Sequence, residues 1–279
     1  MIAHTAEGYR QFAVRLAQKS LKENMLAETR REKIVQLVRS QGELSTEELA
    51  QVVGVSIETV RRDLSTLDKL GELERVHGGA VAPHGLHVED SLSVRRKVAA
   101  DEKLAIGRVA AERLPDGATI FLDLGTTIDA VVKCIRPDFR GTVFTTSLRA
   151  ALKLADFPAI DVILPGGRIR ADEGSVSGMM TSNFLRDFFP DVALISIGAI
   201  SADGYISDFN LDDIHIKELV LENARSAVVL ADSTKFHKTA PYRLCSVSDL
   251  AGVLTTTKLE SHIAERIRKK GGSVLLAEV

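Results

Sequence analysis

The chain has 279 residues, with 36 Lys and Arg against 38 Asp and Glu and a formal net charge of −2. This length favours two domains over a single core, and the near-neutral charge argues against a general polyanion binder. No apolar run is long enough to span a membrane and the N-terminus lacks the apolar core of a signal peptide, so we expect a cytoplasmic protein with no membrane partner. The two cysteines, Cys134 and Cys245, lack the spacing of metal ligands, which favours free thiols and no metal site.

The first residues carry a weak helical pattern. Tyr9, Phe12 and Leu16 recur at helical spacing, so we expect residues 1–27 to form an N-terminal extension that includes a helix. Met25 stands just before the next segment, and we expect residues 1–24 to be dispensable. The intact mass of the protein made from its natural locus checks this expectation.

Residues 28–80 are predicted to form a winged helix-turn-helix head. A short helix places Leu49, Val52 and Val53 on its inner side and ends at a turn with Gly54. Ser56 is placed to cap a second helix. The apolar residues of this second helix, which share its core with the first, are Val60, Leu64 and Leu67.

The second helix and the wing supply the candidate contacts with duplex DNA. In such heads the polar residues near the start of the second helix enter the major groove, and here they are Ser56, Glu58, Thr59, Arg61 and Arg62. A glycine-tipped wing adds Arg75, His77 and Gly78. The alternative is a small helical docking module, because residues 28–80 carry eight Lys and Arg against ten Asp and Glu, whereas a basic head would favour DNA more strongly. The base that each arginine reads stays open.

Residues 81–98 are expected to form a linker, and residues 99–279 a second, larger domain. A helix is predicted from about Ala99 to Leu114. Seven short apolar runs then alternate with helical segments: ATIFLD, TVFTT, IDVILP, DVALISIGA, SAVVLAD, GVLTT and SVLLAE. Such alternation is typical of a parallel sheet covered by helices. The fold class is therefore α/β, with the winged head followed by a Rossmann-like parallel-sheet α/β domain.

The segments that follow the predicted strands resemble anion sites. Ligands of such sheets bind at the carboxyl ends of strands, where helix N-termini offer free N–H groups. Gly125, Thr126 and Thr127 follow the first strand, Ser147 follows the second, and Gly166, Gly167 and Arg168 follow the third. The strings typical of nucleotide triphosphate and dinucleotide sites are absent, so we expect a phosphorylated ligand and no cofactor.

Two later segments place a carboxylate near an ammonium group. Asp213 and Lys217 lie four residues apart on one helix face, and the alternative interpretation is an exposed salt bridge of little energetic value. Asp232 and Lys235 come directly after a predicted strand, which favours a role in ligand binding. A carboxylate beside an ammonium group suits a polyol phosphate.

Together these motifs resemble the DeoR family of bacterial repressors over about residues 28–257. The head contributes RREKIVQLV, VSIETVRRDLSTL and HGGA, and the larger domain contributes DLGTT, TTSL, LPGGRIR and LADSTKF. The resemblance implies a sensor domain similar in fold to ribose-phosphate isomerase and glucosamine-phosphate deaminase, with a ligand surrounded by Asp123, Gly125, Thr126, Thr127, Ser147, Gly166, Gly167, Lys217 and Lys235. The sequence departs from the family pattern at Thr146, Asp213 and Glu218, where Asn, Glu and a basic residue are usual.

The leading hypothesis is a repressor of a carbohydrate-catabolism operon. It would bind operator DNA as a homo-oligomer, either a dimer or a tetramer, and release it when a phosphorylated sugar or related metabolite binds. One alternative is a sugar-phosphate isomerase or deaminase with an appended head, with Asp123, Asp213 and Lys217 as its acid and base groups. Activation of transcription is a further alternative, which depends on the position of the operator.

Overall fold

The computed structural model describes residues 27–38, 43–81 and 89–279. The chain divides between Gly85 and Leu86 into two compact units, a head and a sensor unit, and each is described separately. Residues 1–26 of the predicted N-terminal extension and residues 82–88 of the predicted linker lie outside the described residues. No helix in the described ranges is long and apolar enough to cross a membrane.

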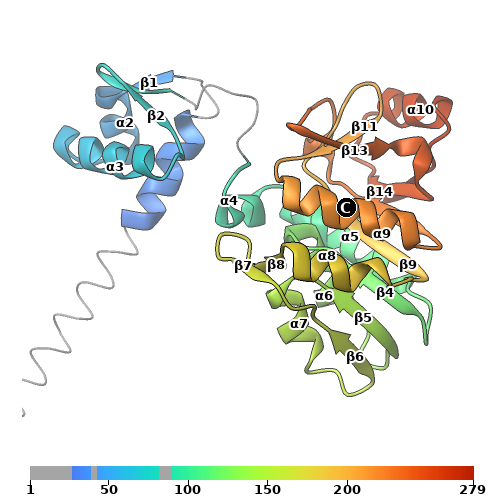
Figure 1. Ribbon diagram of the computed structural model, residues 1–279. Helices are drawn as coiled ribbons and strands as arrows, with labels where there is room; N and C mark the ends of the chain where they lie inside the picture. The colour runs from blue at the N-terminus through green and yellow to red at the C-terminus, as the bar shows by residue number, and fades with distance from the viewer. Residues whose placement is uncertain (1–26, 39–42, 82–88) are drawn as a thin grey trace, which may run out of the picture. The chain divides into compact units, whose positions relative to one another are not determined.

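The head contains three helices and a small antiparallel sheet (Figure 1). A helix at residues 27–38 precedes β1 (Glu43–Ser45), α2 (Thr46–Val53) and α3 (Ile57–Lys69), and the wing is formed by β2 (Glu74–Val76) and β3 (Gly79–Val81). The strand order is β1-β3-β2. The two-stranded wing is confirmed, and β1 extends it to three strands. Gly79 allows β3 to lie against β1, because a Cβ at this position would come within 2.2 Å of the Leu44 carbonyl oxygen.

Helix α2 begins after a capping residue, Ser45, and ends at Gly54. Ser45 and Glu48 form a complete capping box, in which each side chain accepts from the other residue's backbone N–H. The spacing S-x-x-E signals this box, and our prediction missed it. The inward position predicted for Val52 is wrong, because its side chain is 50% exposed. The buried face of α2 is centred between Leu49 and Ala50, and Val52 lies beyond its edge.

The sensor unit is a three-layer α/β fold around a seven-stranded parallel sheet (Figure 1). Its strands are β4 (Thr119–Leu122), β5 (Gly141–Thr145), β6 (Ile160–Ile163), β9 (Val192–Ser196), β12 (Ala227–Leu230), β14 (Gly252–Thr256) and β15 (Val274–Ala277). All seven predicted strands are confirmed. The order β15-β14-β12-β9-β4-β5-β6 reverses direction between β9 and β4, and ligands of such sheets bind beside this reversal.

Helices cover both faces of the sheet and bury two apolar clusters. One face carries α5 (Ala100–Glu112), α6 (Thr126–Cys134) and α7 (Leu148–Leu154), and the other carries α8 (Met179–Arg186), α9 (Leu211–Asn223) and α10 (Ser261–Lys269). Side chains of β4 alternate between the faces, with Ile120 and Leu122 in one cluster and Phe121 in the other. The helix predicted near residues 99–114 is therefore confirmed as α5.

Several short elements complete the sensor unit. Helix α4 (Leu92–Lys97) falls inside the range expected to be linker. A hairpin joins β7 (Arg168–Arg170) to β8 (Ser175–Ser177), and a second small sheet has the order β10-β11-β13. Its strands are β10 (Ala199–Ile200), β11 (Tyr205–Asp208) and β13 (Tyr242–Ser246), and the short helices are η1 (Ser233–Lys235) and η2 (Val247–Asp249).

Candidate functional site

The head presents its predicted DNA contacts on one helix and one turn. Ser56 caps α3 by accepting from the Thr59 N–H at 3.2 Å, and the two hydroxyl oxygens are 2.9 Å apart. The side chains of Glu58, Arg61 and Arg62 are exposed, opposite the buried Val60. These residues therefore occupy the outward face of the helix that the sequence predicts to read DNA.

The wing places its polar residues at the tip and along one strand. Its two-residue turn consists of His77 and Gly78, and Gly78 has a φ of 92°, a conformation that glycine adopts without strain. Arg75, His77 and Gly78 are all exposed. Asp68 at the end of α3 accepts from the Arg75 N–H at 3.0 Å, so the wing is held to the recognition helix.

The sensor unit contains a cleft at the reversal point of the sheet. It is lined by Glu89, Arg95, Leu124, Gly125, Thr126, Thr127, Ser196, Ile197, Asp208, Asp213, Lys217 and Lys235. These residues come from the segments after β4 and β9, from β11, α9 and η1, and from α4 and the residues before it. Six predicted residues are thus brought together here: Gly125, Thr126, Thr127, Asp213, Lys217 and Lys235.

Helix α6 opens onto this cleft with an uncapped N-terminus. Gly125 precedes the helix with a φ of 108° and offers no side-chain cap. The first hydrogen bond of the helix runs from the Asp129 N–H to the Gly125 carbonyl, 2.9 Å, so the N–H groups of the first turn have no intrahelical acceptor. A Cβ at Gly125 would lie 3.0 Å from Ser196 Oγ. Free N–H groups at the positive end of a helix dipole suit an anion.

Lys217 is the centre of a buried charge cluster behind the cleft. Its ammonium group forms an ion pair with Asp208, lies 3.3 Å from Asp123 Oδ2 and donates to the Ser196 carbonyl at 2.8 Å. Burial alone would lower the pKa of Lys217, but the carboxylates of Asp123, Asp208 and Asp213 raise it. Lys217 is only 2% exposed, so the exposed salt bridge weighed for it in the sequence is wrong.

Two carboxylates beside this cluster each keep one oxygen without a donor. Asp123 accepts from the Ser196 N–H at 2.9 Å through Oδ2, and Asp213 accepts from Arg170 at 2.6 Å through its own Oδ2. The Oδ1 atom of each residue is buried without a hydrogen-bond partner. Burial raises the pKa of Asp123 to about 6 despite the nearby Lys217. Buried acceptors are normally satisfied, so these atoms are suited to accept from hydroxyl groups of a ligand.

The remaining predicted residues lie near the cleft without lining it. Ser147 caps α7 through the Ala150 N–H at 3.2 Å, Thr146 is buried, and Asp232 caps η1 through the Thr234 N–H at 3.0 Å. The Gly166 carbonyl accepts from Thr181 at 2.9 Å. A Cβ at Gly167 would lie 2.2 Å from Thr181 Oγ1, and Arg168 pairs with Asp212 at 3.0 Å. These residues shape the loops around the cleft.

Four charged or polar lining residues were missed in the sequence. Ser196 ends a predicted strand, so the rule that located Gly125 also points to it. Asp208 ends β11, an antiparallel strand with no clear sequence pattern. Glu89 and Arg95 belong to the range expected to be linker, and no motif distinguishes them. Their place in the cleft depends on the tertiary fold.

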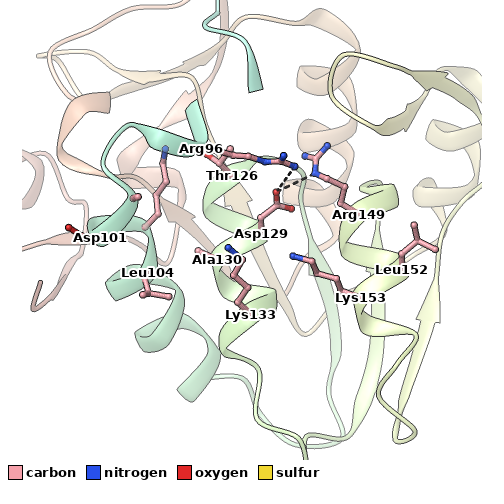
Figure 2. Close-up of a pocket in the computed structure, with 12 residues that line it drawn as sticks. Arg96, Asp101, Leu104, Thr126, Asp129, Ala130, Lys133, Arg149, Leu152 and Lys153 are labelled. Atoms are coloured by element: carbon pink, nitrogen blue, oxygen red, sulfur yellow. Dashed lines mark hydrogen bonds and ion pairs between the residues drawn. The ribbon is translucent and has the colours of Figure 1, made fainter. Parts of the chain in front are cut away.

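A second and larger cavity is lined by residues of α4, α5, α6 and α7. Its volume is about 690 Å³ and its lining is basic, with Arg96, Lys133, Arg149 and Lys153 directed into it (Figure 2). Asp129 lies 3.2 Å from Arg149 and 3.8 Å from Arg96. The cavity is wide and open to solvent, whereas the cleft at the strand ends is narrow. Within the described ranges, no cluster of three potential metal ligands occurs in either place.

Comparison with known proteins identifies the family. Residues 98–257 match the DeoR C-terminal sensor domain, and residues 30–85 match the DeoR-like helix-turn-helix domain. The chain belongs to the DeoR family. The glycerol-3-phosphate regulon repressor of Haemophilus influenzae is 35% identical over 81% of this DeoR-family chain and 88% of its own length. The repressor CsqR of Escherichia coli is 29% identical over 89% and 95%.

Among solved structures, ribose 5-phosphate isomerase A of Methanocaldococcus jannaschii is similar to part of this chain. It is 17% identical, covers 49% of this chain and 54% of its own, and has a TM-score of 0.36. A likeness at this level says nothing about ligand or activity. The resemblance noted in the sequence over residues 28–257 is thus confirmed at the level of the family.

Proposed function

We propose that this DeoR-family protein is a transcriptional repressor that releases operator DNA when a phosphorylated metabolite binds in the sensor cleft. The observation that carries the proposal is the uncapped N-terminus of α6 at Gly125, which opens onto the same cleft as Lys235 and Arg95. A helix N-terminus with two nearby cations provides a site for a phosphate group. The relatives named as glycerol-3-phosphate regulon repressors support this class of ligand.

The rest of the cleft indicates what the phosphate is attached to. Asp123 and Asp213 hold buried oxygens without donors, and their other oxygens are paired with Lys217 and Arg170 respectively. A polyol supplies hydroxyl donors for such oxygens, and a buried acceptor left without one costs roughly 1–3 kcal/mol. We therefore propose a sugar phosphate or polyol phosphate, with the phosphate at Gly125 to Thr127 and the hydroxyl groups toward Asp123 and Asp213.

On the DNA side, we propose that α3 enters the major groove and that the wing contacts the backbone. Arg61 has no ion-pair partner among the described residues, whereas Arg62 pairs with Glu58 at 3.4 Å across exposed surface. A phosphate contact lowers affinity for every sequence when removed, and a base contact relaxes specificity at one position. Binding of Arg61→Ala and Arg62→Ala to operator variants at several salt concentrations distinguishes the two roles. Unchanged binding by both variants contradicts this placement of α3.

We propose that the protein acts as a homo-oligomer, a dimer or a tetramer, because paired heads match half-sites spaced along the duplex. Helix α8 leaves Met179 and Met180 79% and 71% exposed, and large apolar groups in this position suit a contact between copies. Light scattering of the purified protein measures the oligomeric state. A monomer at the concentrations that bind operator contradicts the proposal.

We propose that the cleft binds its ligand without converting it. The curated relatives are named as repressors, and one oxygen of Asp123 is already held by Ser196 and Lys217. Incubation with phosphorylated pentoses, hexoses and amino sugars, followed by product analysis, tests this point. Isomerisation or deamination at enzyme-like rates contradicts it.

The proposal as a whole is tested by a thermal-shift screen followed by operator binding. A ligand that binds only the folded protein raises its melting temperature, so glycerol 3-phosphate and a panel of sugar phosphates are compared with the same compounds without phosphate. We expect a stabilising compound from the phosphorylated set that also releases the operator. Stabilisation without release contradicts the coupling, and no stabilisation by any phosphorylated compound contradicts the site.

A further inference from the structure

The cleft has almost no free space for the ligand proposed for it. Its volume is about 20 Å³, which holds on the order of one water molecule, whereas pockets for small ligands measure about 300–1,000 Å³. A ligand can therefore enter only if a group that lines the cleft moves. The group that moves determines which other parts of the chain change when the ligand binds.

The lining charges indicate which kind of group must move. Glu89, Asp208 and Asp213 are balanced by Arg95, Lys217 and Lys235. A phosphate dianion added to a balanced, poorly hydrated site leaves excess negative charge, which is unfavourable unless a carboxylate is neutralised or leaves. The entering anion thus competes with one of the three carboxylates.

Two of these carboxylates are held by regular structure and buried partners. Asp208 ends β11 and pairs with Lys217, and Asp213 lies on α9 and pairs with Arg170 at 2.6 Å. Both residues are less than 10% exposed. Glu89 instead lies on an irregular segment, half-buried, and its carboxylate pairs with Arg95 Nη1 at 2.8 Å. Glu89 is therefore the carboxylate that can leave at the lowest cost.

Arg95 stays in place when Glu89 leaves. Its second nitrogen pairs with Glu173 in the β7–β8 turn. Lys103 on α5 donates to the Arg95 and Val98 carbonyls at 2.5 and 2.7 Å, which fixes the end of α4. Arg95 and Lys235 then remain as two cations for the entering phosphate.

We propose that Glu89 is an internal competitor of the effector: its carboxylate holds Arg95 in the ligand-free protein, and the effector's anionic group displaces it. This inference rests on the proposed function, because it explains how the same cleft is regulated. Glu89 is the first described residue of the sensor unit, so the ion pair that is lost lies at the N-terminal end of that unit. The effector signal then starts as the loss of one ion pair.

The pKa of Glu89 fits this role. Burial is the main cause that raises it to about 7; Arg95 and Lys235 oppose this rise, and Asp208 and Glu173 contribute to it. A carboxylate with such a pKa is held weakly enough to be displaced near neutral pH. The four charged groups that act on this pKa come from α4, β11, η1 and the β7–β8 turn.

The test compares substitutions on the two sides of the Glu89–Arg95 pair, with inorganic phosphate and glycerol 3-phosphate as probes. Calorimetric titration is expected to show Glu89→Gln binding at least about fivefold more tightly than the wild type and Arg95→Gln at least about fivefold more weakly. If the Glu89–Arg95 pair were only structural, breaking it from either side would change the affinity in the same direction. The proposal predicts affinity changes in opposite directions. Glu112→Gln, an exposed site at the end of α5, is the matched control and is expected to bind like the wild type.

A second readout does not depend on the fold of the arginine variant. In wild-type protein, amide exchange at residues 89–91, which precede α4, is expected to quicken when glycerol 3-phosphate or phosphate binds, while exchange at Gly125 to Thr127 slows and exchange in α4 is unchanged. Equal affinities of Glu89→Gln and wild type, or unchanged exchange at residues 89–91 with protection at Gly125, overturn the competitor role and leave the site intact. Absence of protection at Gly125 with either probe overturns both proposals.

Discussion

The cleft at the strand ends and the basic cavity beside α6 offer opposite evidence for a ligand. The cavity is large, about 690 Å³, yet Lys133 and Lys153 lie on exposed surface and Asp129 is already paired with two arginines. The cleft is nearly closed, but it is lined by Asp213, which has a buried carboxylate oxygen without a donor, and by the uncapped N-terminus of α6. Open volume and unsatisfied buried carboxylate oxygens thus point to different regions, and the variants below test which of them binds the effector.

The largest expected effect follows from removing the central cation of the cleft. Lys217→Met leaves Asp123, Asp208 and Asp213 buried without their shared partner, so we expect the free energy of unfolding to fall by about 3–5 kcal/mol. Chemical denaturation measures it. Lys133→Met in the basic cavity is the control, and a change beyond about 0.5 kcal/mol there, or none at Lys217, breaks the comparison.

The next largest expected effect is a pH-dependent difference in the free energy of unfolding between the wild type and Glu89→Gln. The pKa of Glu89 is raised to about 7, so its contribution to stability is complete below about 4.5 and is lost as the pH rises through about 7. Glutamine does not titrate, so the variant should gain stability relative to wild type from pH 5 to pH 8, by up to about 3 kcal/mol. Denaturation at both pH values checks this, and a pH-independent difference contradicts the raised pKa.

Removing the Lys235 side chain is expected to weaken ligand binding and to have little effect on the fold. Lys235 lines the cleft on η1 and is only half-buried, and a hydrogen bond to a charged group is worth about 1.5–3 kcal/mol. Lys235→Ala should therefore weaken binding of the stabilising phosphorylated compound by about 10- to 100-fold. Titration calorimetry measures this, with the exposed Lys238→Ala as the matched control; equal losses in the two variants point to a general charge effect.

The smallest effect is expected in the basic cavity. Lys133 and Lys153 form no ion pair among the described residues and line the open cavity. The double variant Lys133→Ala with Lys153→Ala should keep the unfolding free energy within about 0.5 kcal/mol of wild type and should respond to the effector unchanged. Loss of the effector response in this variant reverses the assignment of the two regions.

Much of the sensor fold can be predicted from the sequence because its strands are short, apolar and regularly spaced. All seven predicted strands join one parallel sheet, since strands buried on both faces carry continuous apolar runs. The small sheets escaped prediction, because strands such as Ala199–Ile200 and Arg168–Arg170 are two or three residues long. Their pairing depends on partners far away in the chain.

The candidate site can be predicted only in part, because some of its residues are brought there by contacts that are distant in the sequence. Gly125, Thr126 and Thr127 directly follow a strand, where helix N-termini are expected. Arg95 and Glu89 line the cleft because Lys103 and Glu173 hold α4 in place. No local sequence pattern predicts these contacts. Val52 shows the same limit in the head, where the edge of a short helix face decided its exposure.

The most direct test of the account measures operator affinity while the phosphorylated compound that stabilises the protein is added. Fluorescence anisotropy of an operator fragment selected by the protein itself gives this affinity. We expect the wild type to lose affinity by about 5- to 150-fold at saturating compound, and Lys235→Ala to need about 10- to 100-fold more compound for the same loss. A wild-type protein whose operator affinity is unchanged at saturation contradicts the central claim that this cleft controls the head.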